Sequence, residues 1–403
     1  MPSRRFAAVT PAPPDPILGL SESFRNDPRP GKINLSVGVY QDEAGETPVL
    51  ESVREAERRL LEGERTKSYK PITGDPELAD AVHRLVLGPD HILADEGRLV
   101  TAHTPGGTGG LRVVGDFFAQ NALGVTLWLS DPTWANHPAV FEAAGLKTRT
   151  YPYYDPITRG LDFDAMIEGL GDVGEGDVVL LHGCCHNPTG VDPTPEQWAA
   201  IGDLLAERGA LPLIDIAYQG FGAGIDEDAA GLRRLAERLP EAIVVASFSK
   251  NFGLYQERAG AAIFLTENAE RSAAVASRVK IAIRRNYSNP PAHGGDVVRT
   301  ILFDDALRGQ WIDEVAAMRA RIHTVRGQLK EGLDARGVSL SAQGNDFLTR
   351  QSGMFSFTGL TRPQVDRLRD DHAVYVVGSG RINVAGITPD NLEPLCRAIA
   401  AVV

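Results

Sequence analysis

The sequence predicts an α/β fold, with a mainly parallel sheet in a large domain and a smaller α+β domain. Two observations support this prediction. Short, nearly continuous apolar runs recur along the chain, which is typical of strands buried on both faces of a sheet. Amphipathic helical patterns lie between these runs, as expected for the crossover helices that connect parallel strands.

The expected strands and helices follow one another between residues 98 and 265. Apolar runs of strand length are found at 98–103, 125–130, 177–183, 211–217, 242–248 and 260–265. Helical patterns between them include LRVVGDFFAQNA after Gly110 and PEQWAAIGDLLAERG at 195–209.

The pattern changes after about residue 310. Residues 311–337 form one long amphipathic pattern that ends at a glycine, and short mixed elements follow it. We therefore expect four segments along the chain. They are an N-terminal arm at 1–14, part of a small domain at 15–47, a large domain at 48–312 and the rest of the small domain at 313–403.

The composition is that of an ordinary globular protein, with 403 residues, 43% hydrophobic and 23% charged. The net charge of −12 argues against nucleic acid or an anionic membrane as the main partner. No apolar run approaches membrane-spanning length, and three cysteines are too few for a disulfide framework. Arg4 and Arg5 precede no apolar stretch, so we expect an extended arm there instead of an export signal. We expect a cytoplasmic protein without a metal site.

Ligands of open α/β sheets bind in the crevice beyond the carboxyl ends of the strands, so the residues after each apolar run are candidates. The run 98–103 is followed by TPGGTGG, which contains Gly107 and Thr108. Backbone N–H groups at a glycine-rich helix start favour a phosphate. A flexible turn between strand and helix explains the same residues, and the Walker and GxGxxG spacings are both missing.

The next two runs are followed by an aromatic residue and an amide. Trp134 and His137 come after 125–130, and this tryptophan either stacks on a flat ring or packs in the core. Asn187 comes after 177–183, where an Asn-Pro pair by itself indicates only a turn.

The last two parallel runs are followed by an acid and a base. Asp215 lies near the end of the run 211–217 and Tyr218 directly follows it, and a carboxylate between two isoleucines requires a positive partner, whether a ligand or an arginine. Lys250 follows 242–248, and Arg258 comes eight residues later. A lysine at the end of a buried strand is costly to desolvate unless its amine is used.

One ligand accounts for all of these residues. Pyridoxal phosphate has a phosphate, a flat pyridine ring whose nitrogen pairs with an acid, a ring hydroxyl, and an aldehyde that reacts with a lysine. The sequence therefore predicts pyridoxal 5'-phosphate as the cofactor, bound to Lys250 as a Schiff base.

The chain resembles the fold-type I pyridoxal-phosphate aminotransferases of the aspartate and aromatic amino acid group. The resemblance runs from DPILGL (15–20) to the C-terminus. Motifs that match in the right order are KINLSVGVY, TPGGTGGLR, HGCCHNPTG, DIAYQGF, SKNFGLYQER, RRNYSNPPAHG and SGRINVAG. The resemblance implies the fold-type I architecture and transamination between an L-amino acid and 2-oxoglutarate.

The resemblance also implies roles for individual residues. Lys250 holds the cofactor and moves the proton at the substrate Cα, and Asp215 keeps the pyridine nitrogen protonated. Tyr218 and Asn187 hydrogen-bond the ring oxygen. Trp134 is implied to stack on the ring, and His137 is implied to support Asp215 from behind. The implied phosphate contacts are Gly107, Thr108, Ser247, Arg258 and the partner subunit's Tyr69.

Arg381 is implied to bind the α-carboxylate of the substrate, although an arginine between small residues is by itself more typical of a surface. Arg284 matches the residue that reaches the other subunit's site and binds a dicarboxylate side chain, and Arg285 is its rival. Substrate contacts are also implied for Asn187, Trp134 and Gly38. Shared sites of this kind imply a homodimer in which Tyr69 and Arg284 cross the interface.

Four functions fit the sequence to different degrees. Val39, Thr47, Thr108 and Asn289 resemble the aspartate-type members of the group, which implies aspartate as the amino donor, whereas other motifs also resemble the dual aromatic amino acid aminotransferases. A pyridoxal-phosphate lyase is disfavoured because Arg381 and Arg284 are both retained. A regulatory or binding protein on an enzyme scaffold is disfavoured because every expected catalytic residue is present.

Overall fold

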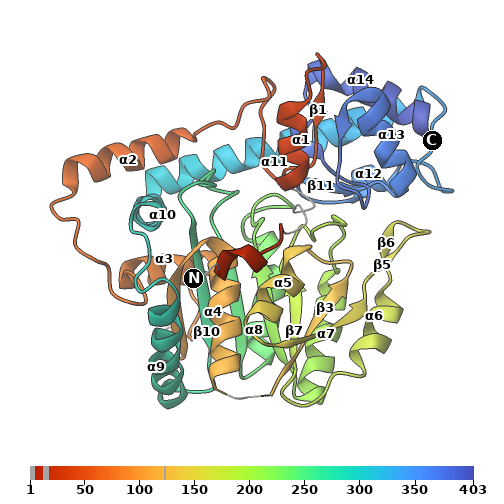
Figure 1. Ribbon diagram of the computed structural model, residues 1–403. Coiled ribbons are helices and arrows are strands. Elements are labelled where there is room, and N and C mark those ends of the chain that lie inside the picture. Colours follow the sequence, from red (N-terminus) through yellow and green to blue (C-terminus); the bar gives the residue numbers. More distant parts are fainter. Residues whose placement is uncertain (1–4, 12–17, 94, 122–123) are drawn as a thin grey trace.

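The computed structural model describes residues 5–11, 18–93, 95–121 and 124–403. A seven-stranded sheet occupies the larger part of the molecule, and a smaller part of helices and short strands lies beyond one end of that sheet (Figure 1). The long helix α11 (Asp305–Asp334) runs from the larger part into the smaller part (Figure 1).

The central sheet is mixed but mainly parallel, as the sequence predicts. Its strands lie in the order β2 (Leu99–Pro105), β10 (Ala259–Leu265), β9 (Ala242–Ser247), β8 (Leu211–Ile216), β7 (Val178–His182), β3 (Thr126–Asp131) and β4 (Lys147–Pro152). Strand β10 is antiparallel to both of its neighbours, and the other pairs are parallel. The sequence does not predict the edge strand β4, because most of its side chains are exposed.

Successive residues of a strand point to opposite faces, so the sheet has a core on each face. Leu213 packs with α4 (Gly106–Gln120) and α9 (Ala269–Asn286), whereas Ile214 packs on the opposite face. The other helices of the larger part are α2 (Glu51–Gly63), α3 (Pro76–Val86), α5 (Asn136–Ala143), α6 (Phe163–Leu170), α7 (Pro195–Arg208), α8 (Ala230–Arg238) and α10 (His293–Phe303).

Helix α4 begins within the glycine-rich stretch, at Gly106, and not after Gly110 as the pattern suggested. The reason is close packing on the sheet, because a Cβ on Gly110 would lie 2.7 Å from Cγ1 of Val245. The glycines therefore let the first turn of α4 approach β9, and this places its free N–H groups at the carboxyl ends of the strands.

Helix α11 begins earlier and ends earlier than the predicted 311–337. The Asp304 side chain accepts a hydrogen bond from the Leu307 N–H and caps the helix before the amphipathic pattern becomes visible. Trp311 and Ile322 pack in the core of the larger part, whereas Leu329 packs in the core of the smaller part.

The smaller part combines segments from both ends of the chain. Its elements are α1 (Leu18–Asn26), β1 (Ile33–Asn34), α12 (Phe347–Arg350), β11 (Phe355–Phe357), α13 (Arg362–His372), β12 (Val374–Tyr375), β13 (Arg381–Asn383) and α14 (Pro389–Val402). Strand β1 pairs with β12, and β11 pairs with β13. The remaining short elements are η1 (Arg5–Ala8), β5 (Tyr154–Asp155), β6 (Gly160–Leu161), η2 (Glu227–Ala229) and η3 (Val384–Gly386).

The predicted domain boundaries stay predictions, and α11 crosses the one expected at 312/313. Of the expected arm at 1–14, residues 1–4 and 12–14 lie outside the described residues, as does 15–17 of the DPILGL motif. None of the described helices combines the length and the apolar character that a membrane-spanning helix needs.

Candidate active site

A cavity of about 630 Å³ lies at the carboxyl ends of the parallel strands. It collects nearly all of the residues that the sequence singles out. Its lining includes Gly38, Gly107, Thr108, Trp134, Asn187, Asp215, Tyr218, Ser247, Lys250, Arg258 and Arg381. Tyr69 and Arg284 are not among its lining residues. Residues from the large sheet and from the smaller part therefore meet around one space.

Lys250 follows β9 and reaches the cavity beside the ring of Tyr218, with its Nζ 4.9 Å from the ring centroid. The pKa of the Lys250 amine is lowered to about 8, mainly by burial, while the charge of Asp215 opposes the shift and that of Arg258 adds to it. A lysine with this pKa is neutral in a sizeable minority of molecules near physiological pH, far more often than an ordinary lysine, and the neutral form is the one that acts as a nucleophile or a base.

Asp215 ends β8 and is held from behind by a histidine. His137 Nε2 lies 3.0 Å from a carboxylate oxygen of Asp215, and its Nδ1 lies 2.8 Å from Thr133 Oγ1. Burial would raise the pKa of Asp215, but the His137 hydrogen bond and the nearby positive charges lower it on balance. The cavity therefore contains a carboxylate that stays ionised although it is only 9% exposed.

The glycine-rich start of α4 forms a cradle for an anion together with β9 and Arg258. A Cβ on Gly107 would lie 3.1 Å from Cβ of Ser247, and a Cβ on Gly106 would lie 2.6 Å from Nη2 of Arg258. The Arg258 guanidinium also donates to Ser249 Oγ at 3.3 Å. Free N–H groups, two hydroxyls and a guanidinium fit a phosphate group.

The ring-facing residues of the cavity come from three different strand ends. Trp134 is half-buried, and its ring meets that of His137 edge to face at 5.2 Å. Tyr218 is buried, and burial raises the pKa of its hydroxyl, which stays protonated as a hydrogen-bond donor. The Asn187 side-chain oxygen accepts a hydrogen bond from Arg381 at 3.2 Å.

Arg381 is buried, with 4% of the residue exposed, so the reading of this arginine as a surface residue is wrong. Its Nη2 donates to the Ser36 carbonyl at 2.6 Å, and its guanidinium lies 4.2 Å from the ring centroid of Phe355. Burial lowers the pKa of Arg381 to about 10. Its Nε has no hydrogen-bond partner among the described residues. A buried guanidinium with a free donor fits a carboxylate ligand.

Phe355 supports this arginine, although sequence reasoning did not find it. A Cβ on Gly38 would lie 2.8 Å from Cζ of Phe355, so a glycine is required beside the ring. Phe355 also meets the ring of Tyr218 edge to face at 5.7 Å. An apolar residue in GMFSF carries no chemical signal of its own, and only the fold reveals its position below Arg381.

Tyr69 and Arg284 lie on the surface outside the cavity. Tyr69 is 92% exposed. Arg284 donates to Ser288 Oγ, which is linked through Asn289 to the Lys70 carbonyl by hydrogen bonds of 3.0 and 2.8 Å. Arg284 is thus tied to the segment that carries Tyr69.

Arg285, the alternative to Arg284, is hydrogen-bonded to a different element of the fold. Arg285 donates to Gln120 Oε1, at the end of α4, at 3.2 Å. The two neighbouring arginines therefore belong to different parts of the surface, and Arg284 shares its part with Tyr69.

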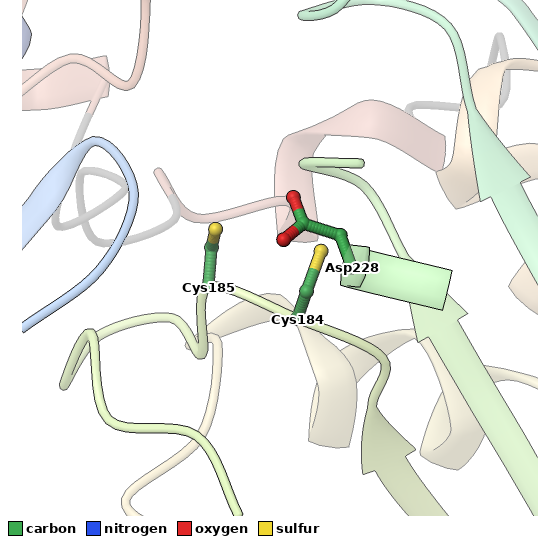
Figure 2. Close-up of side chains that lie close together, drawn as sticks. All are labelled: Cys184, Cys185 and Asp228. Atoms are coloured by element: carbon green, nitrogen blue, oxygen red, sulfur yellow. The ribbon is translucent and has the colours of Figure 1, made fainter. Parts of the chain in front are cut away.

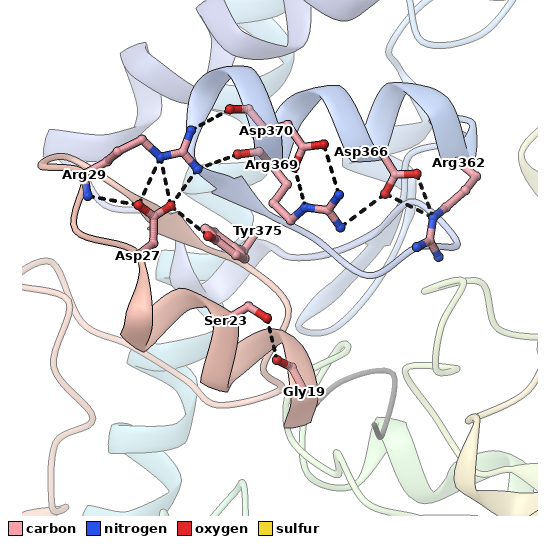
Figure 3. A network of polar contacts seen from close by, with 9 residues as sticks. All are labelled: Gly19, Ser23, Asp27, Arg29, Arg362, Asp366, Arg369, Asp370 and Tyr375. Atoms are coloured by element: carbon pink, nitrogen blue, oxygen red, sulfur yellow. Dashed lines mark hydrogen bonds and ion pairs between the residues drawn. The ribbon is translucent and has the colours of Figure 1, made fainter. Parts of the chain in front are cut away.

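A second cavity, of about 750 Å³, adjoins the first and shares Asn187 and Arg381 with it. Helices α1 and α13 line its other side, and an ionic network joins them (Figure 3). Arg29 binds the carboxylate of Asp27 at 2.6 Å and donates to the Arg369 and Asp370 carbonyls, while the Tyr375 hydroxyl donates to Asp27 at 2.7 Å. The network holds the chain after α1 against the end of α13.

Cys184, Cys185 and Asp228 lie together at the wall of the cavity, which Cys184 lines, with ligand atoms within 4.8 Å of one another (Figure 2). The Asp228 carboxylate accepts backbone N–H groups of Gly220 at 2.8 Å and of Gly222 at 2.9 Å. A hydrogen bond with Cys185, together with burial, raises the pKa of the Cys184 thiol well above its ordinary value. Neutral thiols are poor metal ligands, and the carboxylate is already used to hold the loop that follows Tyr218.

Comparisons with known proteins agree with this geometry. The family model described as "Aminotransferase class I and II" matches residues 30–399. The aspartate aminotransferase of Escherichia coli (strain K12) is 53% identical over 398 residues, which cover 99% of this chain and 100% of that protein. The aromatic-amino-acid aminotransferase of Pseudomonas aeruginosa is 50% identical over 397 residues, which cover 98% of this chain and 98% of that protein.

A solved structure extends the comparison to the cofactor. The aromatic-amino-acid aminotransferase from Burkholderia pseudomallei, covalently bound to pyridoxal phosphate, superposes with a TM-score of 0.95. It is 45% identical, and the match covers 98% of this chain and 99% of that one. The fold is therefore that of the fold-type I aminotransferases. With its cradle, acid and lysine in place, the chain belongs to the class I and II aminotransferases and is a pyridoxal-phosphate-dependent enzyme of that family.

Proposed function

We propose that the enzyme is an aspartate aminotransferase, which moves the amino group of L-aspartate to 2-oxoglutarate. The observation that carries amino acid transamination is the buried Arg381, whose Nε has no partner among the described residues and which lies beside Asn187 at the edge of the cavity. The identity of 53% to the aspartate aminotransferase of Escherichia coli supports the same substrate.

The chain's own residues divide the work of this reaction. Pyridoxal phosphate, when bound, supplies a ring that accepts electrons from the substrate Cα. Asp215, kept ionised by His137, would hold a proton on the ring nitrogen. Lys250, with a pKa of about 8, would attach the cofactor and then carry the proton to and from Cα.

The phosphate and the substrate carboxylate are bound at opposite sides of the cavity in this proposal. Gly107, Thr108, Ser247 and Arg258 would hold the phosphate, while Tyr218 and Asn187 would donate to the ring oxygen and Trp134 would cover the ring. Arg381 would bind the α-carboxylate with its planar fork. Gly38 leaves room for the ring of Phe355, which lies under the guanidinium of Arg381.

We further propose a homodimer in which Tyr69 and Arg284 complete the partner's site. The exposure of Tyr69 and the hydrogen-bonded link between Arg284 and the Lys70 carbonyl support a shared surface for both residues. Arg284 would then bind the side-chain carboxylate of aspartate. A cytoplasmic location is also part of the proposal, supported by three buried cysteines that are free within the described structure.

A dual aromatic amino acid aminotransferase is the second candidate. The observation that favours it is the 50% identity to the aromatic-amino-acid aminotransferase of Pseudomonas aeruginosa, nearly as high as the identity to the aspartate enzyme. In this case the side chain of the substrate would be accepted with or without a second carboxylate.

The test is a visible absorption spectrum of the protein loaded with pyridoxal phosphate, recorded while L-aspartate and L-phenylalanine are added separately without an oxo acid. We expect aspartate to convert the band of the lysine-bound cofactor at least about tenfold faster than phenylalanine, as one extra ion pair allows. Equal or faster conversion by phenylalanine would replace the proposal with the dual aromatic function. Continuous release of fumarate and ammonia, or of alanine and carbon dioxide, from aspartate without an oxo acid would indicate a lyase and contradict both.

A further inference from the structure

Arg326 is a second buried arginine close to the carboxylate site. It belongs to α11, at the point where this helix passes from the core of the larger part to that of the smaller part. Arg326 is 1% exposed, and no described carboxylate forms an ion pair with it. A buried cation without a counter-ion is costly, so its hydrogen bonds must compensate in the native fold.

All of the described hydrogen bonds of Arg326 go to backbone carbonyls of one short segment. Its Nη1 donates to the Leu348 carbonyl at 2.8 Å. Its Nη2 donates to the carbonyls of Gly353 at 2.8 Å and of Ser352 at 3.4 Å, and also to that of Phe355. The planar fork thus fixes the backbone from 348 to 355.

The same segment is clamped from its other side by the turn that carries Asn187. The Ser352 N–H donates to the Gly190 carbonyl at 2.6 Å. A Cβ on Gly190 would lie 2.8 Å from the Phe355 carbonyl, so the two segments are in direct contact. Strand β11, which starts at Phe355, pairs with β13, which starts at Arg381.

Phe355 links this segment to the substrate site. Its ring lies under the guanidinium of Arg381 at 4.2 Å and next to Gly38. A displacement of the Phe355 backbone would move the surface on which Arg381 rests, together with the edge-to-face contact to Tyr218. The position of the carboxylate-binding guanidinium therefore depends on the carbonyls that Arg326 holds.

We propose that Arg326 is a positioning residue for the carboxylate clamp, which fixes Phe355 beneath Arg381 and thereby sets the affinity for the α-carboxylate of the substrate. The proposal rests on the function proposed above, in which Arg381 binds that carboxylate. Arg326 itself does not line either cavity.

The test compares Arg326→Met, which keeps the length and loses the donors, with Arg98→Met as a matched control. Arg98 also donates to backbone carbonyls, those of Thr266 at 2.7 Å and Pro240 at 3.1 Å, but it lies before the amino end of β2, away from the carboxyl ends of the strands. Arg98 also pairs with Glu96 at 3.2 Å, so each variant loses several polar contacts and both are expected to lower the Tm.

Only R326M is expected to weaken carboxylate binding. We expect the KM for L-aspartate and the Kd for succinate, a dicarboxylate without an amine, to rise about tenfold, with kcat changed less than about threefold. The absorption band of the lysine-bound cofactor is expected to stay unchanged. If R326M lowers the Tm like R98M and leaves both constants unchanged, Arg326 is structural only and the inference is wrong.

A double variant separates this inference from the proposed function. Since Arg326 acts through Arg381, R326M combined with R381M is expected to weaken succinate binding by less than the product of the single effects. Independent, multiplicative effects would overturn the inference. If R381M alone leaves succinate binding unchanged, the clamp of the proposed function fails instead.

A more conservative variant keeps the inference testable if R326M does not fold. Lysine retains the charge but is a point donor that cannot reach carbonyls at both ends of the segment. We expect R326K to raise the Kd for succinate by about threefold, between wild type and R326M. A wild-type Kd in R326K would contradict the need for the planar fork.

Discussion

The two sides of the cavity are built in different ways. On one side, Asp215, Ser247 and Lys250 stand at or just after the ends of neighbouring strands of a single sheet, and α4 begins beside them. On the other side, Arg381 and Phe355 belong to two short strands of the smaller part, and the ring of Phe355 packs against Gly38. The first side can be called the cofactor side and the second the carboxylate side.

The two sides also differ in what holds their side chains in position. The cofactor side is fixed by a sheet whose inner strands are buried on both faces, and in the proposed dimer all its groups except Tyr69 come from one chain. The carboxylate side depends on tertiary contacts between distant segments and, in the proposed dimer, on a residue of the partner. Rigid positioning of the cofactor and adjustable recognition of the substrate are therefore assigned to different parts of the fold.

The largest effect is expected on the cofactor side. Lys250→Ala removes the amine that attaches the cofactor and moves the Cα proton in the proposed function, so we expect kcat to fall by at least about 10⁴-fold. Steady-state turnover of aspartate and 2-oxoglutarate measures the loss, and the spectrum of the loaded protein shows whether covalent attachment is lost. Turnover within about tenfold of wild type would refute the role of Lys250.

A smaller and substrate-selective effect is expected on the carboxylate side. Arg284→Ala should lower kcat/KM for aspartate by about 100-fold and that for phenylalanine by only a few-fold, because only aspartate has a side-chain carboxylate. Arg285→Ala is the matched control, since Arg285 is bound to Gln120 on another part of the surface. Equal losses for both amino acids in R284A, or a larger effect of R285A, would exclude Arg284 from this role.

Mixed dimers decide whether Arg284 acts across the interface. Co-expression of R284A and K250A subunits gives heterodimers in which one site combines an intact Lys250 with the partner subunit's intact Arg284. We expect such heterodimers to recover up to about half of the wild-type activity towards aspartate, because two-fold symmetry leaves one complete site in two. Activity no higher than that of R284A alone would place Arg284 in its own subunit's site.

The same contrast explains how much the sequence could predict. Lys250 and Asp215 follow runs that are recognisably buried, so their position at a sheet edge follows from strand geometry. Phe355 and Arg326 offer no such pattern, since one is an apolar residue and the other an arginine within a helical repeat. Their importance comes from contacts between segments far apart in the chain, which local patterns do not contain.

The fold shows the same limit. The six apolar runs are strands, but the direction of β10 and the presence of β4 depend on neighbours in the sheet and not on local sequence. The early start of α11 depends on the capping side chain of Asp304, which lies outside the amphipathic pattern. Local patterns thus predict where elements exist, whereas pairing and capping decide where they begin and how they run.

The smallest expected effect concerns the stability of the cofactor side without its cofactor. The pKa of Lys250 falls from 10.5 to about 8 because of burial, with Arg258 adding to the shift and Asp215 opposing it. Between these two values the unfolded chain binds more protons than the folded one, so the free energy of unfolding rises with pH in this window. Below pH 8 the buried lysine destabilises the cofactor-free fold by a constant amount.

Lys250→Met removes this titration while keeping a long apolar side chain. We expect cofactor-free K250M to melt roughly 2–5 °C above the cofactor-free wild type at pH 7, with the difference shrinking as the pH rises from 8 to 10.5. Thermal unfolding at half-unit pH steps measures this difference. A difference that stays constant across the window would mean that Lys250 is not held in a strongly desolvating position.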